Sequence, residues 1–107
     1  MRIEDSFVQE VLQRVLSVTS PEKIILFGSA ATGQMTSDSD IDLLVIKESV
    51  DDNRRERGEI RASLIGLGKP FDVFVMDAER FEESKNVIGG LAYPANKHGR
   101  LVYEDTR

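Results

Sequence analysis

The sequence contains no cysteine among its 107 residues. Disulfide bonds, thiolate metal sites and cysteine nucleophiles are therefore excluded. The sequence also lacks an excess of basic residues, because it has 14 Lys and Arg but 19 Asp and Glu, which gives a net charge of −5. A broad nucleic-acid-binding surface needs the opposite balance, so we expect none, while a local basic patch stays open.

Long hydrophobic runs are also absent, since no apolar segment approaches the roughly 20 residues that a helix needs to cross a bilayer. The N-terminal residues 1–5 lack the apolar stretch of a signal peptide. We therefore expect a cytoplasmic protein that makes no membrane contact. The length suits one domain, residues 1–107, and is too short for two.

What the sequence does contain is a hydrophobic pattern that predicts helices alternating with strands. Helices are expected over about residues 5–18, 51–67, 78–84 and 86–97, with Pro94 expected to kink the last one or to move its start. Strands are expected over residues 23–27, 40–46, 71–76 and 101–103. Strands separated by helices indicate an α/β or α+β fold, in which helices flank a small sheet.

The most informative feature is Gly28-Ser29, followed after ten residues by Asp40-Ile41-Asp42. Carboxylates at positions i and i+2 of a strand project from the same face. At an effective dielectric constant near 20, two like charges about 4 Å apart repel by roughly 4 kcal/mol. Such a pair requires a shared proton, access to water or a divalent metal ion. The Gly-Ser step after a strand offers N–H groups and a hydroxyl to a phosphate.

Asp72 is a third candidate, because an aspartate is out of place in the apolar run Phe71 to Val75. If its strand lies beside the strand of Asp40 and Asp42, three carboxylates converge. Such oxygen donors suit Mg²⁺ or Mn²⁺ and disfavour zinc. Two such ions can clamp the attacking and leaving oxygens of a nucleotidyl displacement. Gly28 and Ser29 would then hold the β- and γ-phosphates of the departing pyrophosphate.

A P-loop is not a satisfactory alternative, although Gly28 and Gly33 have the glycine spacing of one. The next two residues are Gln34 and Met35, where a P-loop requires Lys and then Ser or Thr. The chain therefore lacks both the phosphate-binding lysine and the metal-holding hydroxyl of that motif.

The Gly28-Ser29 and Asp40-Ile41-Asp42 motifs, with Asp72 on a later strand, resemble the minimal nucleotidyltransferase (MNT) domain of the DNA polymerase β-like superfamily. The resemblance extends over about residues 5–104 and implies that superfamily's palm fold, with a mixed sheet. It implies that Asp40, Asp42 and Asp72 bind the metal ions, with Asp72 as ligand or general base. It also implies that Gly28 and Ser29 contact the triphosphate of ATP.

The resemblance further implies a biological setting. Many small proteins of this type are antitoxins paired with HEPN-domain toxins, in type VII-like toxin–antitoxin systems. The antitoxin transfers AMP from ATP to a tyrosine of the toxin, which makes it a protein adenylyltransferase. Larger relatives modify small molecules, and small-molecule transfer stays an alternative here. The oligomeric state is open, and a homo-oligomer is compatible with the sequence.

The sequence departs from its relatives in the loop after Gly-Ser, where they often carry arginines and this chain has Ala30, Ala31 and Thr32. The missing positive charge puts nucleotide affinity in question and motivates a second hypothesis, a non-catalytic module that neutralises its partner by occlusion. Four cations are candidates to supply the charge instead: Lys23, Lys47, Arg54 and Arg55.

Overall fold

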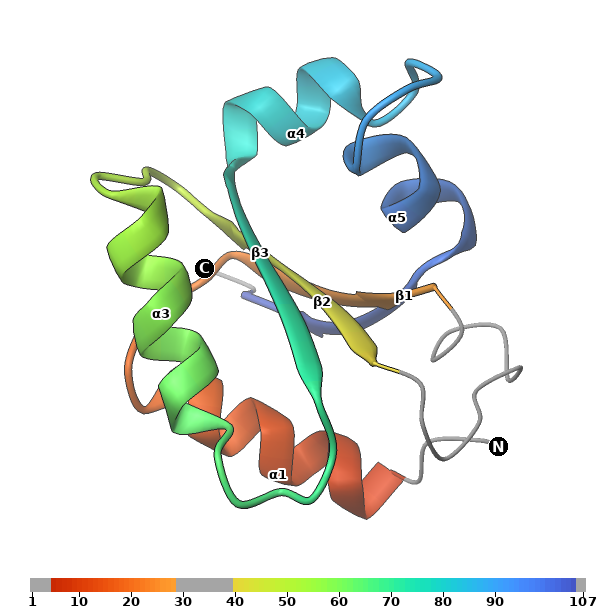
Figure 1. Cartoon of the computed structure of the whole chain (residues 1–107). Helices are drawn as coiled ribbons and strands as arrows, with labels where there is room; N and C mark the ends of the chain where they lie inside the picture. The colour runs from red at the N-terminus through yellow and green to blue at the C-terminus, as the bar shows by residue number, and fades with distance from the viewer. Residues whose placement is uncertain (1–4, 29–39, 106–107) are drawn as a thin grey trace.

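The sheet has four strands in the order β3-β2-β1-β4, and it separates two layers of helices (Figure 1). The computed structural model describes residues 5–28 and 40–105. Within these residues the strands are β1 (Lys23–Phe27), β2 (Ile41–Lys47), β3 (Phe71–Asp77) and β4 (Arg100–Glu104). The helices are α1 (Asp5–Leu16), α3 (Asn53–Ser63), α4 (Ala78–Ser84) and α5 (Ala92–His98).

The sheet is mixed. Strand β1 pairs antiparallel with β2 on one side and with β4 on the other, whereas β2 and β3 run parallel. The parallel pair is joined by α3, as expected for a crossover connection. The fold class predicted from the sequence, a small mixed sheet flanked by helices, is therefore confirmed.

The two faces of the sheet are covered by different helices because the strand residues alternate. One face packs against α1 and α3, and its core includes Leu26, Leu43, Val45 and Val73. The other face packs against α4 and α5, and its core includes Ile25, Phe27, Leu44, Ile46 and Phe81. Figure 1 shows α1 and α3 together on one side of the sheet and α4 and α5 on the other.

Helix α1 follows the apolar stripe read from the sequence, because Val8, Val11, Leu12 and Val15 are all buried. Helix α5 packs closely against β1 because a glycine follows it. An added Cβ at Gly99, which ends this helix, would lie 2.6 Å from Ile25 Cγ2 and 2.2 Å from the Ala95 carbonyl oxygen. Only glycine lets α5 turn directly into β4 against β1.

Two helix predictions need correction. The helix expected over residues 51–67 spans Asn53–Ser63, because Asp52 caps its start and Gly66 and Gly68 adopt positive φ beyond its end. The helix expected over residues 86–97 spans Ala92–His98. Proline is tolerated in a first turn, where backbone N–H groups have no intrahelical partner. Pro94 accordingly lies in the first turn of α5.

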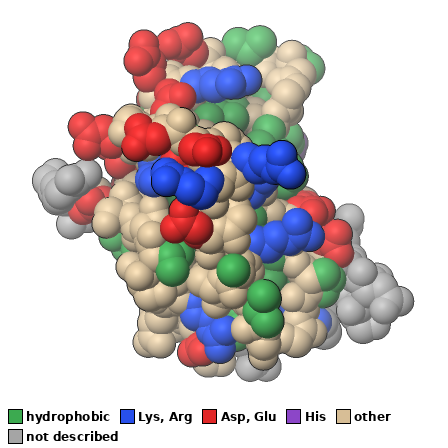
Figure 2. Space-filling view, turned by 60° about the vertical axis from the view of Figure 1, so that its left-hand side comes forward, with side chains coloured by type: hydrophobic (Ala, Val, Ile, Leu, Met, Phe, Trp, Pro, Cys, Tyr) green, Lys and Arg blue, Asp and Glu red, His purple; other side chains and the backbone are tan. Residues whose placement is uncertain are grey.

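Residues 53–63 of α3 carry several exposed arginines, and the face of the molecule that includes this helix is mixed in charge. Figure 2 shows Lys and Arg side chains interspersed with Asp and Glu over this face. Arg55 and Glu59 form one such pair, with 3.5 Å between nitrogen and oxygen. Among residues 5–28 and 40–105, no helix is long and apolar enough to cross a membrane.

Candidate active site

The structure places Asp42 and Asp72 side by side on the parallel strands β2 and β3. Asp42 is the direct partner of Asp72 in the strand register, and on its other side it faces Phe27 of β1. Partners in a ladder project from the same face. Here that face is the one covered by α4 and α5, because the next residues of the same parity, Leu44 and Phe74, pack there. The neighbouring strands inferred for these acids are confirmed.

The electrostatic environment of Asp42 is unfavourable for a negative charge. Burial is the first cause of a raised pKa, and the negative charges of Asp72 and then Asp40 raise the pKa further. Asp40 precedes β2 and is exposed, as is Asp72, whereas Asp42 is half-buried. The charges of Asp40 and Asp72 thus both reach Asp42.

Gly28, at the end of β1, lies directly against the carboxylate of Asp42. Its φ is +70°, and a Cβ built on it would lie 2.2 Å from Asp42 Oδ2. Any side chain would therefore be strained by the backbone and would displace the carboxylate. The absence of a side chain at position 28 lets the Asp42 carboxylate lie directly against the backbone. Ser29, its expected partner in phosphate binding, lies outside the described residues.

The donor chemistry of this site fits a hard divalent cation. Asp40, Asp42 and Asp72 offer only carboxylate oxygens, which Mg²⁺ and Mn²⁺ prefer, and a cation would relieve the repulsion at Asp42. Within residues 5–28 and 40–105, however, no three acidic or histidine side chains form a ready-made coordination group. The assignment of these three residues as metal ligands therefore stays a prediction.

Three of the four cations proposed to supply missing positive charge are engaged elsewhere. Ion pairs join Lys23 to Glu104, Lys47 to Glu56 and Arg55 to Glu59. Lys47 stands five residues beyond Asp42 on β2, so it lies at the opposite end of the strand. These pairings make the cations part of the scaffold rather than of the carboxylate site.

Two other cations lie beside the carboxylates. Arg61 of α3 and Lys69 line a hollow of about 210 Å³ together with Asp40 and Asp72. Sequence reasoning missed both residues, although Lys69 comes only three positions before Asp72. Closeness in sequence could not have indicated Arg61, because only the packing of α3 against the sheet brings it to this end of the molecule.

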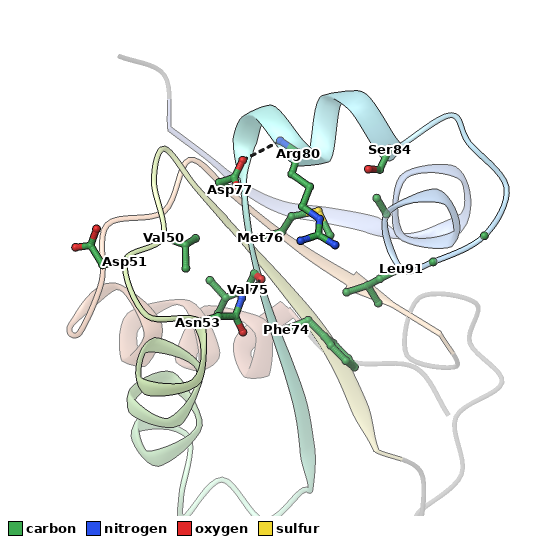
Figure 3. Close-up of a pocket in the computed structure, with 13 residues that line it drawn as sticks. Val50, Asp51, Asn53, Phe74, Val75, Met76, Asp77, Arg80, Ser84 and Leu91 are labelled. Carbon is green, nitrogen blue, oxygen red and sulfur yellow. Dashed lines mark hydrogen bonds between the residues drawn. The ribbon is translucent and has the colours of Figure 1, made fainter.

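A larger pocket of about 550 Å³ lies along the later half of β3, beyond Asp72. Phe74 and Met76, which follow Asp72 at two-residue intervals on the same face, form part of its floor. Helix α4 supplies Arg80 and Ser84, and the loop before α5 supplies Gly89 and Gly90 at positive φ. Figure 3 shows the guanidinium of Arg80 extending from α4 into this space, between Met76 and Leu91.

Comparison with known families identifies the class to which this fold and site belong. The family described as "Nucleotidyltransferase domain" matches residues 5–92. The match spans more than half of the chain, and the chain therefore belongs to the nucleotidyltransferase domain family. The resemblance drawn from the Gly-Ser and Asp-Ile-Asp motifs is confirmed. No curated protein matches the chain.

Solved structures share the fold at low sequence identity. A toxin–antitoxin crystal structure with AMP-PNP has a TM-score of 0.71 at 19% identity, over 92% of this chain and 74% of that one. A putative nucleotidyltransferase from Sulfolobus solfataricus has a TM-score of 0.62 at 22% identity, over 92% and 78%. A Shewanella oneidensis structure of a tri-AMPylated HEPN toxin with MNT antitoxin has a TM-score of 0.61 at 17% identity, over 96% and 74%. These likenesses establish an MNT-type fold.

Proposed function

We propose that this protein is a Mg²⁺-dependent adenylyltransferase that moves AMP from ATP to a tyrosine of a HEPN-type partner, as the antitoxin of a toxin–antitoxin pair. The observation that carries the proposal is the row formed by Gly28, Asp42 and Asp72 across three strands. Family membership supports nucleotidyl transfer. The toxin–antitoxin neighbours, one of them with a tri-AMPylated HEPN toxin, support the choice of acceptor.

In this mechanism the acceptor oxygen attacks the α-phosphorus of ATP. The new bond joins the acceptor oxygen to that phosphorus, and the bond from phosphorus to the oxygen bridging to the β-phosphate breaks. Pyrophosphate leaves on the side of Gly28, whose backbone lies against the Asp42 carboxylate. Asp72, on the opposite side of Asp42, accepts the proton of the attacking hydroxyl. The row of residues thus matches the line of an in-line displacement.

The carboxylates of Asp40, Asp42 and Asp72 would hold the divalent cation. Such an ion supplies charge stabilisation to the attacking and leaving oxygens. The chain's own contribution is to hold Asp42 rigidly: β2 is paired on both sides, and its apolar residues are buried. Asp40, two residues before Asp42, and Asp72, on the neighbouring strand, are both exposed and can reach an ion and its substrate.

A second candidate function is neutralisation of the partner by occlusion alone. It is favoured by the residues after Ser29, where Ala30, Ala31 and Thr32 provide no positive charge for a triphosphate. In that case carboxylate variants bind and neutralise the partner as well as the wild-type protein does. Transfer to a small molecule is a third candidate, which requires turnover without any protein partner.

The decisive experiment is transfer of label from ATP radiolabelled at the α-phosphate, with Mg²⁺, to the product of the neighbouring gene. We expect label on the partner with the wild-type protein and a loss of at least about 100-fold with Asp40→Asn/Asp42→Asn. Label at the γ-phosphate must not transfer, because it leaves with pyrophosphate.

Glu83→Gln is the matched control, because Glu83 is an exposed acid on α4 whose loss removes one charge without touching the site. It should transfer label at the wild-type rate. Transfer by the double variant at the wild-type rate would refute the mechanism. Tight binding of the partner by wild type and double variant alike, with no label on either, would establish the occluding module instead.

A further inference from the structure

The pocket beneath α4 lies on the side from which the acceptor must approach. In an in-line displacement the attacking and leaving groups stand on opposite sides of the phosphorus. Pyrophosphate leaves beside Gly28 at the end of β1, and β3 lies on the other side of β2. Phe74 and Met76 continue from Asp72 along β3 directly into the 550 Å³ pocket. An acceptor whose hydroxyl reaches Asp72 can therefore place neighbouring groups in this pocket.

The pocket contains one cation that points into it. Arg80 stands in the first turn of α4, and its guanidinium extends over Met76 toward Leu91 (Figure 3). Among the residues that the structure describes, no carboxylate forms an ion pair with it. Asp77 uses its Oδ1 to accept the Arg80 backbone N–H at 2.8 Å, whereas the Asp51 side chain points away from the pocket. A guanidinium in this position is suited to bind an anionic group of an incoming molecule.

The segment that leads into the pocket is apolar and exposed, which favours a protein over a small molecule. Val87 and Ile88 immediately precede the glycines that line the pocket, and their exposed fractions are 59% and 82%. Adjacent exposed aliphatic side chains beside a concave site are typical of protein contact surfaces. A free metabolite that fits inside the pocket would leave both side chains in water. The inward-pointing cation and the exposed aliphatic pair together suit a protein segment with one anionic group and flanking apolar side chains.

We propose that this pocket, with Arg80 as its anchoring residue and Val87 and Ile88 in the segment that leads into it, binds the segment of the partner protein that flanks the acceptor hydroxyl. The segment carries a carboxylate that pairs with Arg80. Arg80 is a positioning residue, because it holds the acceptor without touching the reacting atoms. This inference rests on the proposed function, since it specifies how the same carboxylate site selects its acceptor.

The test compares Arg80→Gln and Arg80→Lys with the control Arg57→Gln, an exposed arginine on the opposite helical layer. Transfer of AMP to the neighbouring gene's product is measured as a function of partner and of ATP concentration. We expect Arg80→Gln to raise the KM for the partner about tenfold or more. The KM for ATP stays unchanged, Arg80→Lys recovers part of the loss, and Arg57→Gln behaves as wild type. A merely structural role would alter both KM values together.

Equilibrium binding of the partner and photo-cross-linking from position 88 provide readouts that do not depend on transfer. We expect weaker partner binding by Arg80→Gln, and a cross-link from a photoreactive residue in place of Ile88 to the acceptor-bearing segment. If no sample carried label but partner binding still depended on Arg80, the transfer function would be refuted and the docking site retained. The docking proposal would be overturned if Arg80→Gln bound the partner with wild-type affinity and showed the wild-type KM for it. It would also be overturned if the complex formed normally without that cross-link, or if the wild-type protein bound no partner.

Discussion

Asp42 shows how a single residue can be suited to function at a cost to stability. Its carboxylate is half-buried, faces Asp72 across the ladder and has a raised pKa because of burial and the charges of Asp72 and Asp40. The ionised form is therefore less favourable in the folded protein than in the unfolded chain. Without a cation, this residue destabilises the fold at neutral pH.

We expect Asp42→Asn to be more stable than the wild type in the presence of a chelator at pH 7. The gain should be a few tenths of a kcal/mol, because solvent screens a half-exposed carboxylate. The gain should begin to shrink as the pH falls through the raised pKa, where folded wild-type Asp42 takes up a proton, and should vanish near the unfolded pKa of about 3.9. Urea unfolding at several pH values measures the difference, with Glu83→Gln as the control, and a less stable Asp42→Asn at pH 7 would contradict the interpretation.

At the scale of an element, Glu56 joins the start of α3 to the end of β2. Its Oε1 accepts from Lys47 Nζ, and its Oε2 accepts the backbone N–H groups of Asp51 and Asp52, each at 2.9 Å. The exposed fraction of Glu56 is 8%, so these bonds satisfy a buried charge. Asn53 adds a bond from its Nδ2 to the Val75 carbonyl at 2.7 Å, which ties α3 to β3.

We expect Glu56→Gln to lower the free energy of unfolding by about 1–3 kcal/mol at pH 7, because Lys47 loses its partner. The bond from Lys47 and the backbone bonds hold the pKa of Glu56 below its usual range. The stability from this carboxylate is therefore fully present above the unfolded pKa of about 4.3 and is lost as the pH falls through the folded pKa.

Urea unfolding of wild type and Glu56→Gln between pH 7 and pH 3 provides the measurement. The difference between the two proteins should shrink as the pH falls below about 4.3, because protonated Glu56 resembles glutamine. Arg57→Gln, on the exposed surface of the same helix, should show little change at any pH. A difference that stays constant down to pH 3 would mean that the charge of Glu56 is not what stabilises this junction.

At the scale of the whole molecule, the candidate site depends on three strands that are distant in sequence. Gly28 directly follows β1, Asp42 lies in β2 and Asp72 lies in β3. A ligand bound across these strands requires the folded sheet, so it should stabilise the entire cooperative unit. The expected gain is about 2.7 kcal/mol at a ligand concentration of 100 Kd.

We expect Mg²⁺ with α,β-methylene ATP, which cannot transfer its nucleotide, to raise the melting temperature of the wild-type protein. Asp40→Asn/Asp42→Asn should show no such shift, because it lacks both charges that hold the cation. Arg80→Gln should retain the full shift, since its pocket belongs to the acceptor. An equal rise of the melting temperature in wild type and double variant would mean that the nucleotide binds without these carboxylates, and would contradict the assigned site.

The sequence alone determined most of the secondary structure and the identity of the candidate acids. A nearly continuous apolar run placed β1 at its observed bounds, because this strand is buried on both faces, and Asp77 as a cap placed the start of α4. The errors came at helix ends near Gly66 and Pro94, where capping and turn geometry decide the boundary. Asp72 was detectable because an acid interrupts the apolar run of β3, although the fold leaves its side chain exposed on this edge strand.

Only the tertiary structure decided how these residues meet. The parallel register of β2 and β3 set Asp42 opposite Asp72, and the fold of β1 brought Gly28 against the Asp42 carboxylate. Packing also assigned Lys47 to Glu56 and directed Arg80 into the pocket beneath α4. Local patterns determine which face of an element is buried, whereas strand order and helix packing are set by contacts between segments far apart in the sequence.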